Sequence, residues 1–493
     1  MEQSTAAAKP LTLRHFVGGE WHDGDGREVL SLNPADPSKP VASYRQAGAA
    51  LLDLALASAV SAQPAWDQLG LIGRGRVLRR AAELLALRSD ELARLTTAEE
   101  GKTLPESKGE IDASVETLYY HAAAARNSTG AVFASSNPDE LIRTVRRPVG
   151  TVGVITPWNF PVQIPVWKIA PALLWGNAVV WKPASETPAV SVMLAEVFEA
   201  AGVPAGVLNL LLAPGELGTV LVASEQVSAI TFTGSVPVGR SIARVAVERR
   251  AKVQLELGGH NAAIVMPDVD PGLAADALVA GAMGSTGQKC TATRRIIAVG
   301  EAYDLLVPEI RTRIESLRVG NGAEAGIDIG PLVSARARSD VTEAIETAIQ
   351  EGAEVVARTD IADLGESFLA PTVLAGSPDL AICNDEVFGP VTTILRARDL
   401  DEAIEIANRT AFGLTATVFT SDEVTVRRCV DEIDAGLVKA NAPTTGSELH
   451  VPFGGLKASS FPAPREQNSE SSADFFTWTK SAYLRTAPHW DKR

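Results

Sequence analysis

The feature that most constrains the fold is a regular alternation of short apolar runs with longer amphipathic stretches between residues 150 and 256. The apolar runs predict strands over 151–155, 178–181, 207–211, 229–232 and 253–256. The stretches between them predict helices over 164–175, 187–201, 216–223 and 236–248, with Thr187 placed to cap the second. This alternation predicts a parallel, doubly wound α/β sheet, with ligands beyond the carboxyl ends of its strands.

The rest of the chain divides around this region. Residues 49–127 predict helices, because apolar residues recur at intervals of three and four. A second region of alternating strands and helices follows over 260–440. The segments 128–149 and 470–486 stand apart, because both are polar and carry strand-like pieces. They could pair with each other, within one chain or between subunits.

Composition and charge argue against several classes of protein. The 493 residues carry a formal net charge of −15, which disfavours a nucleic-acid partner. No stretch approaches the roughly 18 apolar residues of a membrane span, and the amino terminus shows no signal-peptide pattern. The three cysteines are too scattered for a disulfide framework, and the six histidines show no metal-ligand spacing. We therefore expect a cytoplasmic protein with reduced thiols, no membrane contact and no metal site.

One cysteine lies in a setting that suits chemistry. Cys290 follows the small, polar, glycine-bearing stretch 284–289, whereas Cys383 and Cys429 are expected to be ordinary core residues. A thiolate can attack a carbonyl carbon, and a carboxylate can later activate the water that breaks the resulting thioester. Glu256 is the candidate for that general base, because apolar residues precede it and glycines follow it. The pairing of Cys290 with Glu256 indicates aldehyde oxidation.

A nucleotide-binding turn is also indicated. The dinucleotide fingerprint G-x-G-x-x-G is missing, because Gly73 and Gly75 are followed by Leu78 and lie in a helical stretch. Phe232-Thr-Gly-Ser235, followed by Gly239, stands instead where a predicted strand turns into a predicted helix. Such a turn places backbone N–H groups where phosphate binds, although taken alone it is more often a plain strand–turn–helix connection.

Taken together, the motifs resemble the aldehyde dehydrogenase superfamily. They occur in the family's order and spacing across nearly the whole chain, and they are Thr156-Pro-Trp-Asn-Phe-Pro161, Trp181-Lys-Pro-Ala184, Phe232-Thr-Gly-Ser235, Glu256-Leu-Gly-Gly259, Gly287-Gln-Lys-Cys290, Glu386-Val-Phe-Gly-Pro390 and Pro452-Phe-Gly-Gly455. The stretches 285–293, 457–460 and 464–467 look most like 2-oxoglutaric semialdehyde (2,5-dioxopentanoate) dehydrogenases.

The resemblance implies an α/β fold with a doubly wound parallel-sheet cofactor domain, an αβ catalytic domain and a small β element for oligomerisation. The expected boundaries are 1–127 and 150–257 for the cofactor-binding domain, 258–440 for the catalytic domain, 128–149 and 470–486 for the oligomerisation strands, and 441–469 for a tunnel-lining return segment. A homodimer or homotetramer is implied as well.

Catalytic roles follow from the same resemblance. Cys290 is implied to be the nucleophile, and the oxyanion is held by the side-chain amide of Asn159 with the backbone N–H of Cys290. Hydride transfer to a nicotinamide leaves a thioester on Cys290, which water activated by Glu256 hydrolyses. That base also argues against a CoA-acylating member. Lys168 and Glu466 match positions of a proton relay to solvent, and a surface ion pair is the alternative interpretation of these two residues.

The family positions imply a site for NADP or NAD. Gly234 and Ser235 would receive the adenine-side phosphates, Lys182 the adenosine ribose and Glu386 the nicotinamide ribose, with Phe388 near the ring. The full set is Ile155, Thr156, Pro157, Trp158, Lys182, Ser185, Gly215, Phe232, Thr233, Gly234, Ser235, Val238, Leu257, Glu386 and Phe388.

Ser185 bears on the choice between the two cofactors. NAD-preferring relatives often carry glutamate at this position, where it accepts hydrogen bonds from the ribose 2′-hydroxyl. A carboxylate would repel a 2′-phosphate, whereas serine would not and Lys182 would attract it. We therefore predict that NADP is accepted and preferred, with the neighbouring Glu186 opposing this preference.

The implied substrate tunnel combines aromatic and polar positions. Its members are Phe160, Gln163, Trp167, Lys289, Thr291, Arg294, Thr444 and Phe453. A dicarboxylate semialdehyde needs a cation or donors for its distal carboxylate, and Lys289, Gln163 and Arg294 are the candidates. Arg294 and Arg295 are adjacent, so one is expected to face the site while the other forms a structural ion pair.

Two alternatives stay open beside an acidic semialdehyde. The aromatic positions Phe160, Trp167 and Phe453 favour a broader aliphatic or aromatic aldehyde substrate. A non-catalytic binding protein with the same fold is disfavoured by the intact Cys290, Glu256 and Asn159. His260, the proline-rich stretch 461–464 and Asn468 depart from the family pattern, and we expect these positions near the tunnel rim and the relay.

Overall fold

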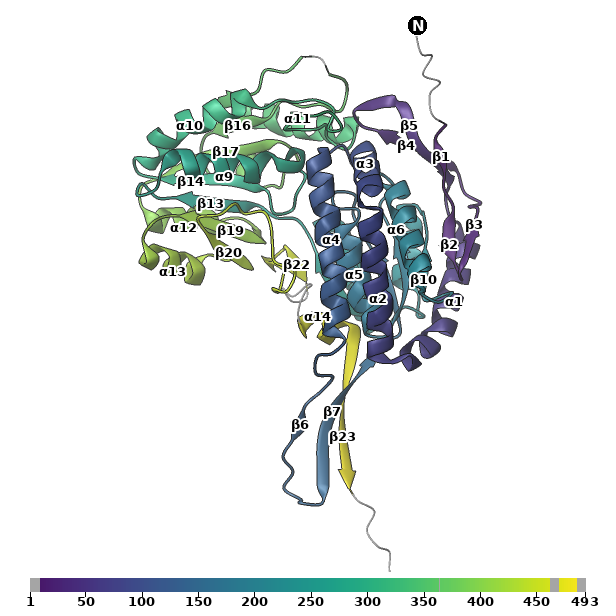
Figure 1. Cartoon of the computed structure of the whole chain (residues 1–493). Coiled ribbons are helices and arrows are strands. Elements are labelled where there is room, and N and C mark those ends of the chain that lie inside the picture. The colour runs from purple at the N-terminus through teal and green to yellow at the C-terminus, as the bar shows by residue number, and fades with distance from the viewer. Residues whose placement is uncertain (1–8, 363, 462–469, 486–493) are drawn as a thin grey trace, which may run out of the picture.

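The computed structural model describes residues 9–362, 364–461 and 470–485 (Figure 1). One half of the molecule is built on an eight-stranded sheet in the order β22-β12-β11-β8-β9-β10-β2-β3. Its parallel centre consists of β8 (Thr151–Ile155), β9 (Ala178–Lys182), β10 (Leu208–Leu210), β11 (Ala229–Thr233) and β12 (Lys252–Glu256). The antiparallel edges are β22 (Ser460–Phe461), β2 (His15–Val17) and β3 (Glu20–His22). The predicted parallel, doubly wound sheet is confirmed.

The central strands form because nearly every side chain in them is buried. Val152, Val154, Val179, Val180 and Ile230 are fully inaccessible to solvent, as expected for a parallel sheet with helices on both faces. After β8 the chain adds β9 and β10 on one side of it and then β11 and β12 on the other, so the strand order switches between β8 and β11. A crevice therefore opens beyond their carboxyl ends, which is where open α/β sheets bind ligands.

The helices of this half follow the expected ranges closely. They are α1 (Ala49–Gln68), α2 (Gly70–Leu87), α3 (Ser89–Glu100), α4 (Leu104–Ala124), α5 (Gln163–Leu174), α6 (Pro188–Ala201), α7 (Gly215–Ala223) and α8 (Val236–Glu248). Thr187 precedes α6 but its side chain makes no capping bond. The carboxylate of Glu99 on α3 accepts the N–H groups of Ala189 and Val190 instead, at 3.0 and 2.9 Å, so Thr187 holds the predicted N-cap position while Glu99 supplies the capping bonds.

A second, seven-stranded sheet forms the other half (Figure 1). Its order is β15 (Glu354–Arg358), β16 (Thr372–Ala375), β17 (Val391–Ala397), β14 (Thr293–Val299), β13 (Asn261–Val265), β19 (Thr415–Phe419) and β20 (Leu437–Ala440). All neighbours are parallel except β15 and β16. The helices of this half are α9 (Pro271–Met283), α10 (Ala302–Ser316), α11 (Ala335–Gln350), α12 (Leu400–Asn408) and α13 (Glu423–Glu432), with short 3-10 turns η1 (Gly284–Gly287) and η2 (Ala381–Cys383).

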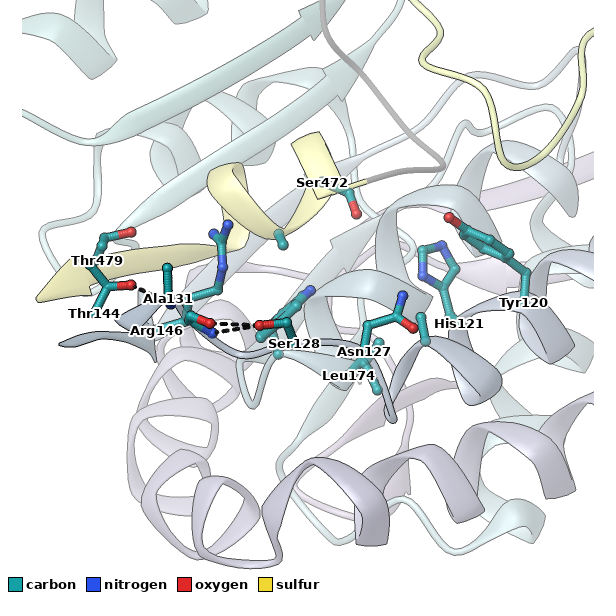
Figure 2. A pocket seen from close by; sticks show the side chains of 14 residues that line it. Tyr120, His121, Asn127, Ser128, Ala131, Thr144, Arg146, Leu174, Ser472 and Thr479 are labelled. Atoms are coloured by element: carbon teal, nitrogen blue, oxygen red, sulfur yellow. Dashed lines mark hydrogen bonds between the residues drawn. The ribbon is translucent and has the colours of Figure 1, made fainter. Parts of the chain in front are cut away.

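A β arm extends from the body (Figure 1). It contains β6 (Val132–Phe133), β7 (Glu140–Pro148) and β23 (Thr477–Arg485), and the helix α14 (Glu470–Phe476) leads into it. β7 and β23 pair antiparallel along their whole length, so the two segments set apart in the sequence meet within one chain. At the base of the arm, Tyr120 and His121 from α4 and Arg146 from β7 line a cavity of about 260 Å³ (Figure 2).

Two small sheets complete the structure. β1 (Leu11–Thr12), β5 (Asp36–Arg45) and β4 (Glu28–Asn33) form a three-stranded sheet, and β18 (Phe412–Gly413) pairs with β21 (Leu456–Lys457). None of the helices in the described residues combines the length and the apolar character needed to cross a bilayer.

Candidate active site

The Cys290 turn lies between α9 and β14. It begins with a run of left-handed residues: Ser285, Thr286 and Gly287 have φ values of 51°, 56° and 67°. Such a conformation is unfavourable for side chains with a Cβ, so surrounding contacts must maintain it. The Thr286 hydroxyl donates to the carbonyl of Gly330 at 3.1 Å, and the N–H of Ser285 donates to Glu106 at 2.6 Å. Cys290 is partly exposed, whereas Cys383 and Cys429 are buried as expected.

The Asn159 turn meets the Cys290 turn directly. Asn159 follows β8 and is only 5% exposed. Its side-chain amide donates a hydrogen bond to the carbonyl of Gln288 at 3.0 Å, two residues before Cys290. The expected oxyanion donor therefore lies against the turn that carries the expected nucleophile.

Glu256 reaches the same place from the end of β12. A Cβ at Gly259 would lie 2.4 Å from the carbonyl oxygen of Cys290, so the chain after Glu256 packs directly against the cysteine. Glu256 is buried, and the hydroxyl of Ser460 donates to its Oε1 at 2.6 Å. The structure thus brings Cys290, Asn159 and Glu256 together from two turns and the end of a strand.

Lys168 lies deeper, on α5. It is 1% exposed and its Nζ donates to the hydroxyl of Thr231 at 2.9 Å, which donates in turn to Gln254 at 2.9 Å. Gln254 and Glu256 are two residues apart on β12 and therefore point to the same face. This arrangement suits a polar path leading away from Glu256. Glu466, the other expected relay residue, lies outside the described residues.

The expected nucleotide site is a cavity of about 400 Å³ at the switch point between β8 and β11. The expected residues that line it are Ile155, Thr156, Pro157, Lys182, Ser185, Gly215, Phe232, Thr233, Gly234, Ser235 and Val238. The side chain of Ser235 makes no capping bond at the start of α8, which leaves the first N–H groups of that helix available to a phosphate. The cavity therefore fits the adenine-side half of a dinucleotide.

The expected nicotinamide-side residues lie together near Cys290. Glu386 accepts the N–H of Gly259 at 2.9 Å, and burial raises its pKa. A Cβ at Gly258, which follows Leu257, would lie 2.1 Å from Glu386 Oε2, so any side chain there would displace the Glu386 carboxylate. Phe388 packs edge-on against Trp158, with ring centroids 5.7 Å apart. The glutamate is thus fixed close to both Glu256 and Cys290.

Lys182 and Ser185 lie at the adenosine end of the cavity. Burial lowers the pKa of the Lys182 ammonium, and the nearby carboxylates of Glu186 and Glu216 oppose this shift. The phenol of Tyr44 is buried, which raises its pKa, and it shares a hydrogen bond with Ser185. Glu186 is exposed beside them. The immediate neighbourhood of Ser185 therefore presents the Tyr44 hydroxyl together with the carboxylate of Glu186.

The expected tunnel residues make two kinds of contact: some pack through aromatic rings, and Thr444 bonds the backbone near Cys290. The rings of Trp167 and Phe453 are 5.7 Å apart and tilted by 42°. Phe160 lies under the ammonium of Lys102, with 4.2 Å from Nζ to the ring centroid. Thr444 is 1% exposed and donates to the carbonyl of Thr291 at 2.7 Å, which stabilises the chain after Cys290. Gln163 is the first residue of α5.

The structure corrects the expectations for the two adjacent arginines. The guanidinium of Arg294 is buried behind the Cys290 turn and donates to the carbonyls of Gly389 and Gly287, at 2.7 and 2.5 Å. It is therefore removed as a candidate for the substrate carboxylate. Burial lowers the pKa of Arg294 to about 10, and the charges of Glu386 and Cys290 oppose the shift.

Arg295 points to the other face of β14 and forms no ion pair with a described residue. It donates to the carbonyls of Ile406 and Ala407 at the end of α12, at 2.7 and 3.0 Å, and thereby stabilises that terminus. His260 is 2% exposed and bonds the carbonyl of Ile382, so it is not at a tunnel rim. Burial lowers its pKa to about 3.

Comparison with known proteins identifies the family. The family model described as "Aldehyde dehydrogenase family" matches residues 21–482. The chain belongs to the aldehyde dehydrogenase family. It is 41% identical over 478 residues to the alpha-ketoglutarate semialdehyde dehydrogenase of Haloferax volcanii, covering 95% of this chain and 98% of that one.

Solved structures agree with this assignment. This aldehyde dehydrogenase superposes on betaine aldehyde dehydrogenase from Staphylococcus aureus in complex with NAD+ with a TM-score of 0.93, at 30% identity, covering 98% of this chain and 97% of that one. It superposes on 3,6-anhydro-L-galactose dehydrogenase in complex with NAP with a TM-score of 0.91, at 32% identity, covering 96% of this chain and all, 100%, of that one. The aldehyde dehydrogenase fold and a nicotinamide cofactor, expected from the sequence, are confirmed.

Several residues at this aldehyde dehydrogenase site had no role in the sequence interpretation. Ser460 holds Glu256, and Gln288 accepts the Asn159 amide. Both lie in motifs that were recognised by resemblance, so the motif was the available signal although the contact was not. Thr103 and Glu106 form a capping box at the start of α4, which the sequence could have signalled, whereas the bonds of Lys102 to Asn159 and of Glu106 to Ser285 join positions more than 50 residues apart and carried no local signal.

Proposed function

We propose that this aldehyde dehydrogenase oxidises an acidic semialdehyde, 2-oxoglutaric semialdehyde, to 2-oxoglutarate, with NADP as the preferred cofactor. The observation that carries the proposal is the ammonium of Lys289, next to Cys290. It is half-buried, yet it forms no ion pair with a carboxylate of the described residues. Burial lowers its pKa, and Glu106 and Glu100 oppose that shift from a distance.

A half-buried cation without an ion-pair partner favours an anionic ligand. Isolated charges are costly to bury, so a substrate carboxylate would recover interaction energy at this position. With Arg294 engaged by backbone carbonyls, Lys289 and Gln163 remain as candidates for the distal carboxylate. The relative from Haloferax volcanii, whose name specifies alpha-ketoglutarate semialdehyde, supports the same substrate.

The residues of this chain divide the reaction between them. The thiolate of Cys290 attacks the aldehyde carbon, and the amide of Asn159 with the backbone N–H of Cys290 stabilises the oxyanion. A nicotinamide, when bound, supplies the hydride acceptor. Glu256, oriented by Ser460, then takes a proton from the water that hydrolyses the thioester on Cys290. Lys168 and Glu466 are proposed to pass that proton toward solvent.

The cofactor residues are proposed to act as their positions suggest. Gly234 and Ser235 would bind the phosphates at the start of α8, and Glu386 the nicotinamide ribose. Ser185 with Lys182 would accept a 2′-phosphate, which supports the preference for NADP. We also propose a cytoplasmic enzyme that assembles as a homodimer or homotetramer through the β7–β23 arm.

A broader aldehyde specificity is the second candidate. The ring contact between Trp167 and Phe453 favours it, because an aromatic wall accepts uncharged side chains.

A substrate panel separates the two candidates. Formation of NADPH and NADH is measured on 2-oxoglutaric semialdehyde, succinic semialdehyde, an unsubstituted aliphatic aldehyde and benzaldehyde, with Cys290→Ala as control. We expect kcat/KM to be highest on 2-oxoglutaric semialdehyde with NADP, and turnover to vanish in Cys290→Ala. A preference for uncharged aldehydes contradicts the carboxylate proposal, and a preference for NAD contradicts the role of Ser185.

A further inference from the structure

The Cys290 turn and the Asn159 turn are both bonded by charged residues at the start of α4, which have no role in the proposed function. α4 begins at Leu104, and its first turns carry Glu106 and Glu110, four residues apart and therefore on one face of the helix. Lys102 lies immediately before the helix. Each of these charged groups bonds the backbone of a catalytic loop.

Glu106 holds the Cys290 turn. Its Oε1 accepts the N–H of Ser285 at 2.6 Å, at the first of the left-handed residues. Its Oε2 accepts the N–H and the hydroxyl of Thr103 at 3.1 and 2.9 Å, which fixes the carboxylate. A backbone N–H in a strained turn is thus held by an oriented acceptor.

Glu110 and Lys102 hold the Asn159 turn. Glu110 Oε1 accepts the N–H groups of Val162 and Gln163 at 2.8 and 3.1 Å, where α5 starts. Glu110 Oε2 accepts from Lys102 Nζ at 2.9 Å, and the same ammonium donates to the backbone carbonyl of Asn159 at 2.5 Å. Lys102 is 0% exposed and Glu110 is 3% exposed.

A buried pair of this kind is weak support for stability alone, because apolar side chains of the same volume often stabilise a fold as well or better. Its directional bonds do something that apolar packing cannot. They fix the position of the Asn159 backbone. From this position the Asn159 side-chain amide bonds the carbonyl of Gln288 in the Cys290 turn. Both turns are therefore positioned by the same helix, α4.

We propose that Lys102, Glu106 and Glu110 are positioning residues, which set the distance between the Cys290 nucleophile and the Asn159 oxyanion donor from the start of α4. The inference rests on the roles proposed above for Cys290 and Asn159. It adds a determinant of the reaction rate that lies behind both loops and touches neither substrate nor cofactor.

A double-mutant cycle tests the Lys102 arm. Lys102→Met removes the donor while keeping most of the volume, and Asn159→Ala removes the amide. The reaction is hydrolysis of p-nitrophenyl acetate, which needs the thiolate and the oxyanion site but no cofactor and no particular aldehyde. Because a misplacement of about 1 Å costs roughly 100-fold, we expect Lys102→Met to lower kcat by about 10- to 100-fold in the wild type. In the Asn159→Ala background, its effect should shrink to less than about 3-fold.

Matched variants on α4 keep the test informative if Lys102→Met folds poorly. Glu106→Gln retains an oxygen acceptor for the Ser285 N–H, whereas Glu106→Ala does not. We expect kcat to fall by at least 10-fold in Glu106→Ala and by less than about 3-fold in Glu106→Gln, with KM nearly unchanged in both. Glu116→Gln, on the exposed side of the same helix, serves as the control.

The inference is overturned if Lys102→Met is as damaging without the Asn159 amide as with it, or if Glu106→Ala matches Glu106→Gln. These outcomes are distinct from failure of the proposed function, which would appear as ester hydrolysis that depends on Cys290 without oxidation of any aldehyde on the panel.

Discussion

Gly287→Ala is predicted to displace the Cys290 turn without removing any of the reacting groups. Gly287 has a φ of 67°, and a Cβ there would lie 2.0 Å from the carbonyl oxygen of Gly389. Ordinary contact begins at 3.4 Å, so the turn or the Gly389 loop must move by more than 1 Å. Alanine in a left-handed conformation adds about 1–2 kcal/mol.

The expected magnitude follows from that displacement. A shift of about 1 Å at the reacting atoms costs roughly 100-fold in rate, which corresponds to about 2.7 kcal/mol. Together with overpacking, which costs about 1–3 kcal/mol, the free energy of unfolding should fall by about 2–5 kcal/mol. We therefore expect a folded enzyme with a kcat about 100-fold lower and a slower alkylation of Cys290 by iodoacetamide.

Gly284→Ala is the matched control, three residues earlier in the same turn. Gly284 has a φ of −54°, and the nearest atom to an added Cβ is the movable Nζ of Lys289, at 3.0 Å. Both variants are assayed for steady-state NADPH formation with benzaldehyde, whose turnover is not expected to depend on Lys289, and for alkylation rate and thermal unfolding. Equal kcat values for the two variants would refute the argument that the close approach to Gly389 maintains the cysteine geometry.

Three further predictions concern charge. Lys289→Met should raise KM for 2-oxoglutaric semialdehyde by about 10-fold or more and leave kcat/KM for benzaldehyde within about 3-fold, because only the acidic substrate loses a cation; equal losses on both substrates would contradict its role. Ser185→Glu should lower kcat/KM for NADP by about 10- to 100-fold while NAD is affected little, since the carboxylate repels only the 2′-phosphate; an unchanged cofactor ratio would contradict the assignment. Burial raises the pKa of Glu100 to about 7 from 4.5, so the native state binds its proton more tightly and loses stability as pH rises through that window. Glu100→Gln lacks this loss, and its free energy of unfolding relative to the wild type should increase by up to about 3 kcal/mol between pH 4.5 and pH 7, as measured by chemical denaturation; a pH-independent difference would contradict it.

The sheet could be predicted from the sequence because its signal is local. Val152, Val180 and Ile230 belong to short apolar runs, and such runs are what a strand covered on both faces requires. Cys290, Glu256 and Asn159 could be proposed as nucleophile, base and oxyanion donor because they lie in motifs whose spacing resembles a known family. The same resemblance placed most of the expected nucleotide residues around one cavity.

The remaining contacts could not be predicted, because they join positions that are distant in sequence. Thr187 stands where a cap is expected, yet Glu99 on another helix bonds the same N–H groups. Arg294 and Arg295 are adjacent cations, and only the fold shows that both are engaged by backbone carbonyls. The sequence shows that two positive charges are adjacent. The direction in which each guanidinium points depends on the segments that pack against β14, and these are distant in sequence.

The central claim is that Cys290 carries an acyl group that Glu256 removes. The most direct test incubates the Glu256→Gln variant with 2-oxoglutaric semialdehyde and NADP, and follows the enzyme by intact and peptide mass spectrometry. The account predicts about one equivalent of NADPH per active site, then very slow turnover, with the acyl mass increase on the peptide that contains Cys290. Steady turnover at the wild-type rate, or an adduct on Cys383 or Cys429 instead, would contradict it.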